Sequence, residues 1–168
     1  FVPLGVPNSE LKTIDKSIAK QALGFSKDEF LVLTVSAQLS TPLKGIDRLM
    51  EVLSIVASDI LPLKVMTLGS DPLDTTIANV DFYNMGSVWG PNFKSIIFSA
   101  ADVLVSSSYE ETFGQTIIEG YSCGTPAIVF NNAALPELVE FGKTGYIATD
   151  VKDFSKYLLA MIQDRSIG

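Results

Sequence analysis

Hydrophobic residues along this chain fall into two alternating patterns, short continuous runs and longer stretches with helical spacing. The run FLVLTVSA at residues 30–37 is apolar and β-branched, which is typical of a strand covered on both faces. From residue 44 to 57 the apolar side chains recur on one helical face, at Ile46, Leu49, Met50, Leu53 and Val56. The first two elements are therefore predicted to be a buried strand and an amphipathic helix.

The same alternation continues to the end of the chain. Further strands are expected near residues 63–68, 82–85, 103–106, 126–130 and 145–148. Helices are expected near 92–99, 115–122 and 153–162, with a short irregular helix before residue 82 and another helix opened by Pro136. Strands that alternate with helices imply right-handed crossovers between parallel strands. The sequence therefore predicts an α/β fold with three layers and a doubly wound parallel sheet of about six strands.

The first 24 residues differ from the rest of the chain. A length of 168 residues suits one domain with a sizeable core and is short for two. In residues 1–24, two prolines and a glycine precede a polar helical stretch, and the chain begins at Phe1 without a methionine. We interpret the chain as a fragment, with residues 1–24 a connecting segment from a missing N-terminal domain and residues 25–168 one domain.

Charge and residue usage exclude several classes of function. With 12 basic and 19 acidic residues the net charge is −7, so a broad cationic surface for nucleic acid is excluded. One cysteine, Cys123, allows no disulfide within the chain and no cysteine metal cage. With no histidine, nucleophile pairs that use histidine and histidine-bound zinc are excluded as well.

No segment has the length of a membrane span. The most apolar stretch, residues 96–105, is interrupted by Ser99 and Asp102 and falls short of the ~20 residues that a bilayer requires. The sequence predicts a soluble, cytoplasmic protein. Its low charge fits either a face that packs against an absent domain or a well-filled core, and these two interpretations stay open.

The loops that follow the strands are where an open α/β sheet binds its ligands. Lys44 lies at a predicted helix start, where its ammonium and free amides suit a phosphate, although the loop alone fits a solvated lysine better. Gly69 opens a tight turn in which the backbone can approach a ligand, and a bare turn fits equally. No second glycine completes a dinucleotide fingerprint, so a nicotinamide cofactor has weak support.

The segment YEETFGQTIIEG at residues 109–120 carries the most chemistry. Glu111 and Glu119 are eight residues apart, about 12 Å along a helix, which is too far for a paired acid and base. We expect them to contact different parts of one long ligand, with Gly114 letting the backbone pass close and the amides of residues 112–115 facing its oxygens. Each glutamate by itself also fits a helix start or a solvent-facing position.

These motifs together resemble the donor-binding half of the family four (group 1) glycosyltransferases, from Pro3 onward. The resemblance is carried by Lys44-Gly45, Gly69, Gly86-Ser87-Val88, the E-x-F-G-x-x-x-x-E pattern from Glu111 to Glu119, Cys123–Pro126, Pro136-Glu137 and Lys143-Thr144-Gly145. It implies a GT-B enzyme built from two Rossmann-like domains. Residues 25–168 would then be the C-terminal domain that binds a nucleotide-diphosphate sugar, and the absent N-terminal domain would bind the acceptor.

The resemblance also implies a role for each matching residue. Glu119 would hold the ribose hydroxyls, and the catalytic pair would be Glu111, beside the donor sugar, and Lys44, at the diphosphate. The remaining donor-binding positions are Gln38, Gly69, the base-bordering turn Gly86, Ser87 and Val88, and the backbone of Thr112, Phe113, Gly114 and Gln115. Transfer would proceed with retention and without a metal or other cofactor, which agrees with the absence of an Asp-x-Asp pair.

The chain departs from the family pattern at three places. Gln38 stands where the family usually has an arginine, which leaves one of two expected diphosphate cations and puts transition-state stabilisation in doubt. Ala133-Ala134 replaces a usual glycine pair and is expected to alter donor preference, whereas Ser107 in place of proline is expected to be harmless. Cys123 is expected to pack in the core.

The sequence therefore predicts the donor domain of a retaining, hexosyltransferase-type enzyme in surface polysaccharide or glycolipid synthesis. The acceptor would be a sugar or a lipid-linked group bound through the missing domain, with peripheral contact of the full-length protein at the inner membrane face. The isolated fragment is expected to be inactive. Two alternatives stay open: a GT-B sugar-nucleotide epimerase, and a catalytically silent nucleotide-binding domain, which Gln38 favours and the two glutamates oppose.

Overall fold

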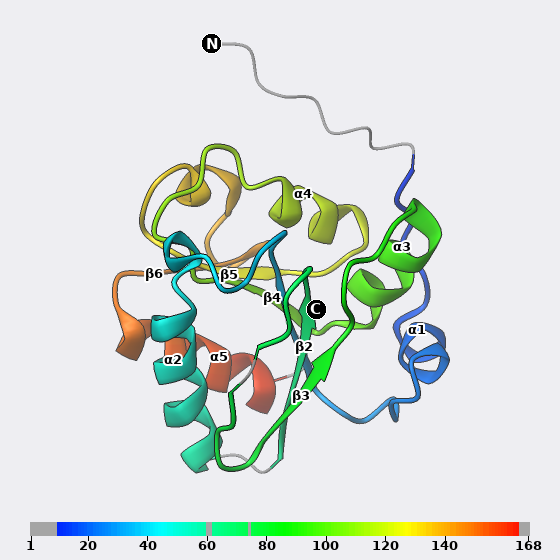
Figure 1. Cartoon of the computed structure of the whole chain (residues 1–168), viewed down its shortest axis with the longest axis horizontal. Helices are drawn as coiled ribbons and strands as arrows, with labels where there is room; N and C mark the ends of the chain where they lie inside the picture. Colours follow the sequence, from blue (N-terminus) through cyan, green and yellow to red (C-terminus); the bar gives the residue numbers. More distant parts are fainter. Residues whose placement is uncertain (1–9, 60–61, 74, 165–168) are drawn as a thin grey trace.

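One all-parallel sheet of six strands organises the protein. The computed structural model describes residues 10–59, 62–73 and 75–164, and in this part of the chain the strand order is β3-β2-β1-β4-β5-β6 (Figure 1). The strands are β1 (Leu31–Val35), β2 (Leu63–Leu68), β3 (Val80–Asn84), β4 (Val103–Ser106), β5 (Ala127–Phe130) and β6 (Gly145–Ala148). The predicted α/β fold with a doubly wound parallel sheet is confirmed.

Helices cover both faces of this sheet (Figure 1). They are α1 (Lys16–Ala22), α2 (Ile46–Asp59), α3 (Pro91–Ala100), α4 (Gln115–Ser122) and α5 (Val151–Gln163), with 3-10 turns η1 (Pro42–Lys44) and η2 (Leu135–Leu138). Helices α1, α3 and α4 share one apolar cluster with Leu31 and Leu33, and α2 and α5 share another with Val32. Alternate residues of β1 thus serve opposite faces, which explains its continuous apolar run. No helix in the described part of the chain is long and apolar enough to cross a membrane.

Three local predictions differ from the structure. The described part of residues 69–79 contains bends and turns in place of the short irregular helix, and Pro72 there lacks the amide that a helix needs. Helix α2 begins at Ile46, because Gly45 adopts a left-handed φ of 61°. Pro136 lies in the four-residue turn η2, which is shorter than the expected helix.

The segment that leads into the sheet packs on the fold at α1. Lys20 on α1 is 2% exposed, and its Nζ donates to Asp102 Oδ2 at 2.7 Å and to the Glu29 carbonyl at 2.6 Å. Asp102 also accepts from the Leu31 amide at 2.8 Å, so one carboxylate joins α1 to the start of β1. These hydrogen bonds hold α1 against the residues that precede β1 and β4. Residues 1–9 lie outside the described residues. A domain boundary at residue 24 stays a prediction.

Replacement of Asp102 by alanine is expected to lower the free energy of unfolding by about 3–5 kcal/mol, because the Lys20 ammonium would stay buried without its charged partner. Urea unfolding followed by circular dichroism measures the loss. Lys16→Ala is the matched control: Lys16 is 37% exposed and pairs with the same carboxylate at 3.4 Å, so its loss should cost about 1 kcal/mol or less. Equal losses in the two variants would contradict the role given to Lys20.

The alanine pair before η2 makes a second prediction. Ala133 has a φ of 54°, in the left-handed region, whereas Ala134 has a φ of −82°. Because the left-handed conformation costs an L-residue about 1–2 kcal/mol and a glycine nothing comparable, Ala133→Gly is expected to raise the free energy of unfolding by about 0.5–1 kcal/mol. Ala134→Gly, the control, should lower it. Destabilisation of similar size in both variants would exclude backbone strain at Ala133.

Candidate functional site

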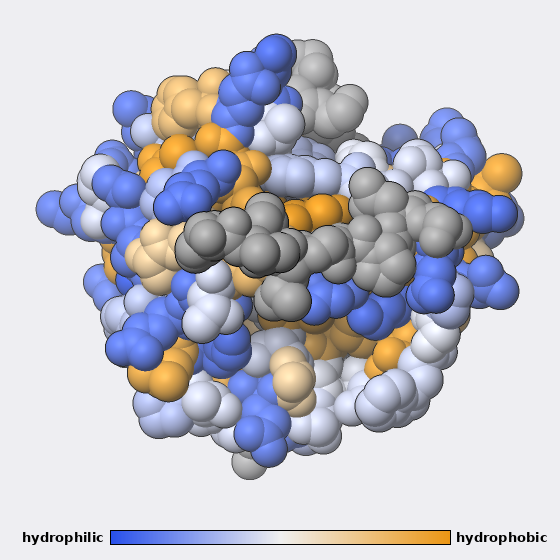
Figure 2. Space-filling view, turned by 90° about the horizontal axis from the view of Figure 1, so that it is seen from above, coloured by the Kyte–Doolittle hydropathy of each residue, from blue (hydrophilic) through white to orange (hydrophobic). Residues whose placement is uncertain are grey.

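A hollow of about 560 Å³ opens at the edge where the strands end, beyond β1 and β2 and beside the start of α4. In sequence order, β2 and β3 lie on one side of β1, and β4, β5 and β6 lie on the other. The loops after β1 and β4 thus leave in different directions, which is where open α/β sheets bind ligands. Figure 2 looks onto this edge, where hydrophilic side chains are frequent around the outline and hydrophobic residues show between them.

The hollow is lined by some of the predicted residues and by others that the sequence did not indicate. The predicted ones are Gln38, Gly69, Ser87, Val88, Gln115 and Glu119. The others are Val35, Ser36, Ala37, Leu68, Ser70, Trp89, Lys94 and Thr116. The predicted residues outside this lining are Lys44, Gly86, Glu111, Thr112, Phe113 and Gly114. The hollow therefore contains the position expected at the ribose, Glu119, and two residues of the turn expected at the base, Ser87 and Val88, whereas the expected catalytic pair does not line it.

Glu119 on α4 is the buried carboxylate of the hollow. It is 7% exposed, and Lys94 of α3 donates to both of its oxygens, at 3.2 and 3.4 Å. The Gln115 side-chain amide, one turn earlier on α4, reaches the same carboxylate at 3.3 Å. Glu119 therefore presents to the hollow two carboxylate oxygens whose positions are fixed by Lys94 and Gln115.

Lys94 and Trp89 were not found by sequence analysis. Lys94 is the one charged residue in the sequence of α3, PNFKSIIFSA, and that isolated charge on an apolar helix was the available signal. Trp89 follows the predicted Gly86–Val88 turn and is 90% exposed. Both also line a smaller hollow of about 290 Å³ that extends the first one toward Glu10 and Leu11. The two hollows share Val88, Trp89, Lys94, Gln115 and Glu119.

Lys44 and Glu111 form a second ion pair at the same edge of the sheet. Lys44 ends η1 after β1, and Glu111 lies in the loop between β4 and α4. Their Nζ and Oε2 atoms are 3.2 Å apart, with both side chains partly exposed. Because residues 111–114 precede α4, the separation expected for a continuous helix does not apply to Glu111 and Glu119. The two glutamates nevertheless fall in separate clusters, each with its own lysine.

Two of the predicted glycines are needed by the fold itself, Gly69 because of a close backbone contact and Gly114 because of its positive φ. A Cβ at Gly69 would lie 2.4 Å from the Ser36 carbonyl oxygen, and a Cβ at Gly114 would lie 2.6 Å from a methyl carbon of Leu138. Gly114 also has a φ of 74° as the N-cap of α4. Helix α4 thus begins beside the hollow, with the positive end of its dipole at that edge.

Asp71 holds the loop after β1 against the loop after β2. Its carboxylate accepts hydrogen bonds from the amides of Leu39 and Ser40, both at 2.7 Å. The Ser40 side chain and then its backbone amide are the main causes that lower the pKa of Asp71 from 3.8 to about 2. Ser70, next to Asp71, donates from its amide and its hydroxyl to the Ala37 carbonyl, at 3.0 and 2.7 Å. These bonds fix the wall of the hollow that carries Gln38.

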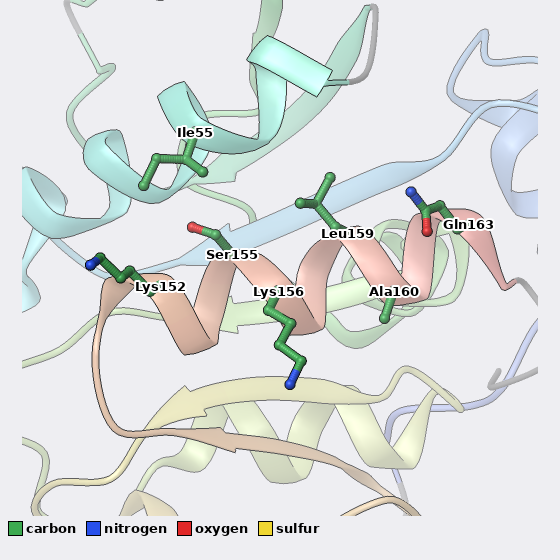
Figure 3. A pocket seen from close by; sticks show the side chains of 7 residues that line it. All are labelled: Ile55, Lys152, Ser155, Lys156, Leu159, Ala160 and Gln163. Carbon is green, nitrogen blue, oxygen red and sulfur yellow. The ribbon is translucent and has the colours of Figure 1, made fainter.

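A third hollow lies away from this edge, between α2 and α5 (Figure 3). It has a volume of about 430 Å³ and is lined by Ile55, Lys152, Ser155, Lys156, Leu159, Ala160 and Gln163. The hydroxyl of Ser155 donates to the Val151 carbonyl of its own helix at 2.8 Å. This lining contains no carboxylate and no thiol, and its charged groups are the ammonium groups of Lys152 and Lys156.

In the described part of the chain, Cys123 has the surroundings of a core residue, and the acidic side chains form no metal-binding group. Cys123 is 3% exposed, and burial raises the pKa of its thiol, as suits a residue that packs in the core. No group of three or more histidine, cysteine, aspartate or glutamate side chains that could hold a metal occurs in the described ranges. Metal-independent chemistry stays a prediction.

The lowered pKa of Asp71 predicts a pH dependence of stability. Since its folded pKa of about 2 lies below the ordinary 3.8, the stabilisation is present above pH ~4 and is lost as the pH falls toward 2. Urea midpoints of the wild type and Asp71→Asn should therefore differ at pH 5 and converge at pH 2. Asp28→Asn, an exposed carboxylate, is the control and should follow the wild type. A constant difference across this range would mean that ionisation of Asp71 is not the cause.

Comparison with known proteins shows which family this chain resembles. The family described as "Glycosyl transferases group 1" matches residues 29–164. The D-inositol 3-phosphate glycosyltransferase of Rhodococcus erythropolis is 29% identical over 148 residues, which cover 79% of this chain and 33% of that protein. The O-antigen chain mannosyltransferase B of Escherichia coli is 39% identical over 72 residues, 42% of this chain and 18% of that protein. The chain thus spans about a third or less of these two relatives.

Solved structures share its fold. Sucrose-phosphate synthase from Thermosynechococcus elongatus superposes with a TM-score of 0.80 at 24% identity, over 99% of this chain and 44% of that one. The Anabaena protein HepE, in complex with UDP and glucose, superposes with a TM-score of 0.74 at 22% identity, over 97% of this chain and 47% of that one. With the family match over most of its length, the chain belongs to the group 1 glycosyltransferases of GT-B fold.

Proposed function

We propose that this chain is the donor-binding domain of a retaining glycosyltransferase that uses a nucleotide-diphosphate sugar. The observation that carries the proposal is the buried Glu119 carboxylate, paired with Lys94, in a hollow at the carboxyl edge of the sheet. Support comes from HepE, which shares the fold and is a complex with UDP and glucose. Because the chain spans a third of its Rhodococcus erythropolis relative, acceptor binding is assigned to a part of the protein outside this sequence.

Glu119 is assigned to the ribose of the donor. A carboxylate has two oxygens that can accept from both hydroxyls of a cis-diol, in charge-assisted hydrogen bonds. Lys94 supports this role because its ammonium places a positive charge beside the buried Glu119 carboxylate. The base is assigned to the region of Ser87, Val88 and Trp89, which line the same hollow.

Lys44 and the start of α4 are assigned to the diphosphate. An ammonium and a helix N-terminus both stabilise the charge that develops on a departing diphosphate, so these groups supply without a metal the positive charge that the reaction needs. A diphosphate at Lys44 would compete with Glu111, whose freed carboxylate would then accept from a hydroxyl of the donor sugar. Gln38, in the loop after β1, offers a neutral amide. We expect this amide to stabilise the charge of the diphosphate less than an arginine would.

The relatives' names support a hexosyltransferase in surface polysaccharide or glycolipid synthesis. They include an O-antigen chain mannosyltransferase, a D-inositol 3-phosphate glycosyltransferase and a sulfoquinovosyl transferase. We propose that the acceptor is a sugar or a lipid-linked group and that the full-length protein works at the cytoplasmic side of a membrane surface.

In the second candidate function, which Gln38 favours, the chain binds a nucleotide but the protein transfers no sugar. Product analysis with the full-length protein distinguishes transfer from epimerised donor or no reaction.

Trp89 allows a direct binding test, because it is the one tryptophan of the sequence and lines the hollow. Titration with UDP, GDP and ADP, in EDTA, is expected to give a saturable change in its fluorescence with at least one of them. Glu119→Gln is expected to weaken that binding at least tenfold, since each hydrogen bond to a charged group contributes about 1.5–3 kcal/mol before compensation by water.

Glu51→Gln is the matched control, because Glu51 is exposed on α2 and lines neither hollow. It should bind like the wild type. Binding that appears only with magnesium or manganese would overturn metal-free recognition. Unchanged affinity of a folded Glu119→Gln variant would overturn the ribose assignment, and no binding of any of the three nucleotides would overturn the donor-binding function.

A further inference from the structure

Arg48 joins the beginning of α2 to the loops that follow β4 and β5. Its Nε donates to the Ser107 carbonyl at 2.6 Å, and its Nη2 donates to the Ser108 carbonyl. The same Nη2 reaches Asn132 Oδ1 at 3.2 Å. One planar guanidinium therefore holds two successive carbonyls after β4 together with a side chain after β5, a geometry that lysine does not reproduce.

Two aromatic rings pack against the same guanidinium. Its central carbon lies 4.1 Å from the ring centroid of Tyr109 and 3.8 Å from that of Phe130. These two rings and the hydrogen bonds to Ser107, Ser108 and Asn132 together restrict the orientation of the guanidinium. None of the ion pairs among the described residues includes Arg48. Carbonyl oxygens and rings thus take the place of a carboxylate as its partners.

The loop that Arg48 holds is also tied to the segment that carries Lys44. The Ser107 hydroxyl donates to the Lys44 carbonyl, and the Tyr109 amide donates to the Leu43 carbonyl, both at 2.8 Å. A Cβ on Gly45 would lie 2.0 Å from the Ser107 oxygen, so the two backbones meet directly. Glu111 follows two residues after Tyr109 and reaches Lys44 from this loop.

Asn132 supports the same loop from the other side. Its Nδ2 donates to the carbonyls of Ser108 and Tyr109, at 2.8 and 2.7 Å. Arg48 and Asn132 together therefore satisfy the carbonyls of residues 107–109, which have left β4 and its ladder of hydrogen bonds. In contrast, Glu119 lies on α4, Lys94 lies on α3 and Trp89 lies in the loop before α3, and none of them receives a hydrogen bond from Arg48.

We propose that Arg48 is a positioning residue for the phosphate and sugar end of the site. It fixes the loop at residues 107–111 and, through it, the placement of Glu111 against Lys44. This inference rests on the proposed function. It divides the site into two parts: the diphosphate and sugar part depends on the Arg48 contacts, and the base and ribose part does not.

The test compares a nucleoside diphosphate with its monophosphate. The probe is whichever of UDP, GDP and ADP the wild-type chain binds most tightly, together with UMP, GMP or AMP to match, each followed by Trp89 fluorescence. Arg48→Met removes both the positive charge and the planar set of hydrogen-bond donors, whereas Arg48→Lys keeps the charge and removes the planar donors. Both are expected to weaken diphosphate binding at least tenfold and to change monophosphate binding less than threefold.

Asn132→Ala removes one support of the loop and leaves Arg48 in place, so it should act in the same direction. Amide hydrogen exchange should accelerate at residues 107–111 in all three variants while the strands stay protected. Lys152→Met, which removes an exposed cation from α5, should change neither binding nor exchange.

Equal weakening of monophosphate and diphosphate, unchanged binding, or unfolding of all three variants would each overturn the positioning role. If the wild-type chain binds none of the nucleotides, the proposed function fails and this inference fails with it. Wild-type binding together with unchanged affinity in Arg48→Met and Arg48→Lys overturns this inference alone.

Discussion

Parallel pairing of β1 with β2 on one side and with β4 on the other is the constraint on which the rest of this structure depends. Parallel strands require connections that return over the faces of the sheet, so each face is covered and each strand starts from the same edge. The carboxyl ends then gather the connecting loops at the opposite edge. The order of the strands makes the loops of β1 and β4 diverge, and the hollow lies beside that point. Topology thus determines where the polar side chains collect.

Close contact between backbones is the second requirement at this edge. Gly45 meets the Ser107 carbonyl, and Gly69 meets the Ser36 carbonyl, at distances that leave no room for a Cβ. In the sequence, Gly69 indicates a turn in which the backbone can approach a ligand. In the fold both glycines let one loop of the protein approach another. The hydrogen bonds of Asp71 and Arg48 then hold the loops together by side chains, so contacts within the protein position the wall of the candidate site.

Much of the fold could be predicted because its signals are local. The runs at residues 103–106 and 145–148 coincide with β4 and β6, since a buried parallel strand is apolar throughout. Boundaries set by a single cap were missed: α5 begins at Val151 because the Asp150 side chain accepts from the amide of residue 153. The contacts of Lys94, Trp89 and Arg48 could not be predicted, because each depends on neighbours 25 or more residues away or on exposure. Lys94 and Glu119, for example, are joined only when α3 and α4 lie side by side.

The two lysine–glutamate pairs at this edge have a consequence for a chain with a net charge of −7. Each pair is locally neutral, so the field at the edge differs from that of the acidic surface as a whole. A charged ligand exchanges one partner for another instead of meeting a bare charge. When the ligand departs, lysine and glutamate can pair again, and neither is left desolvated and alone. Neither binding nor release of a charged ligand at such an edge would leave a lysine or a glutamate unpaired, which is compatible with reversible binding at the proposed site.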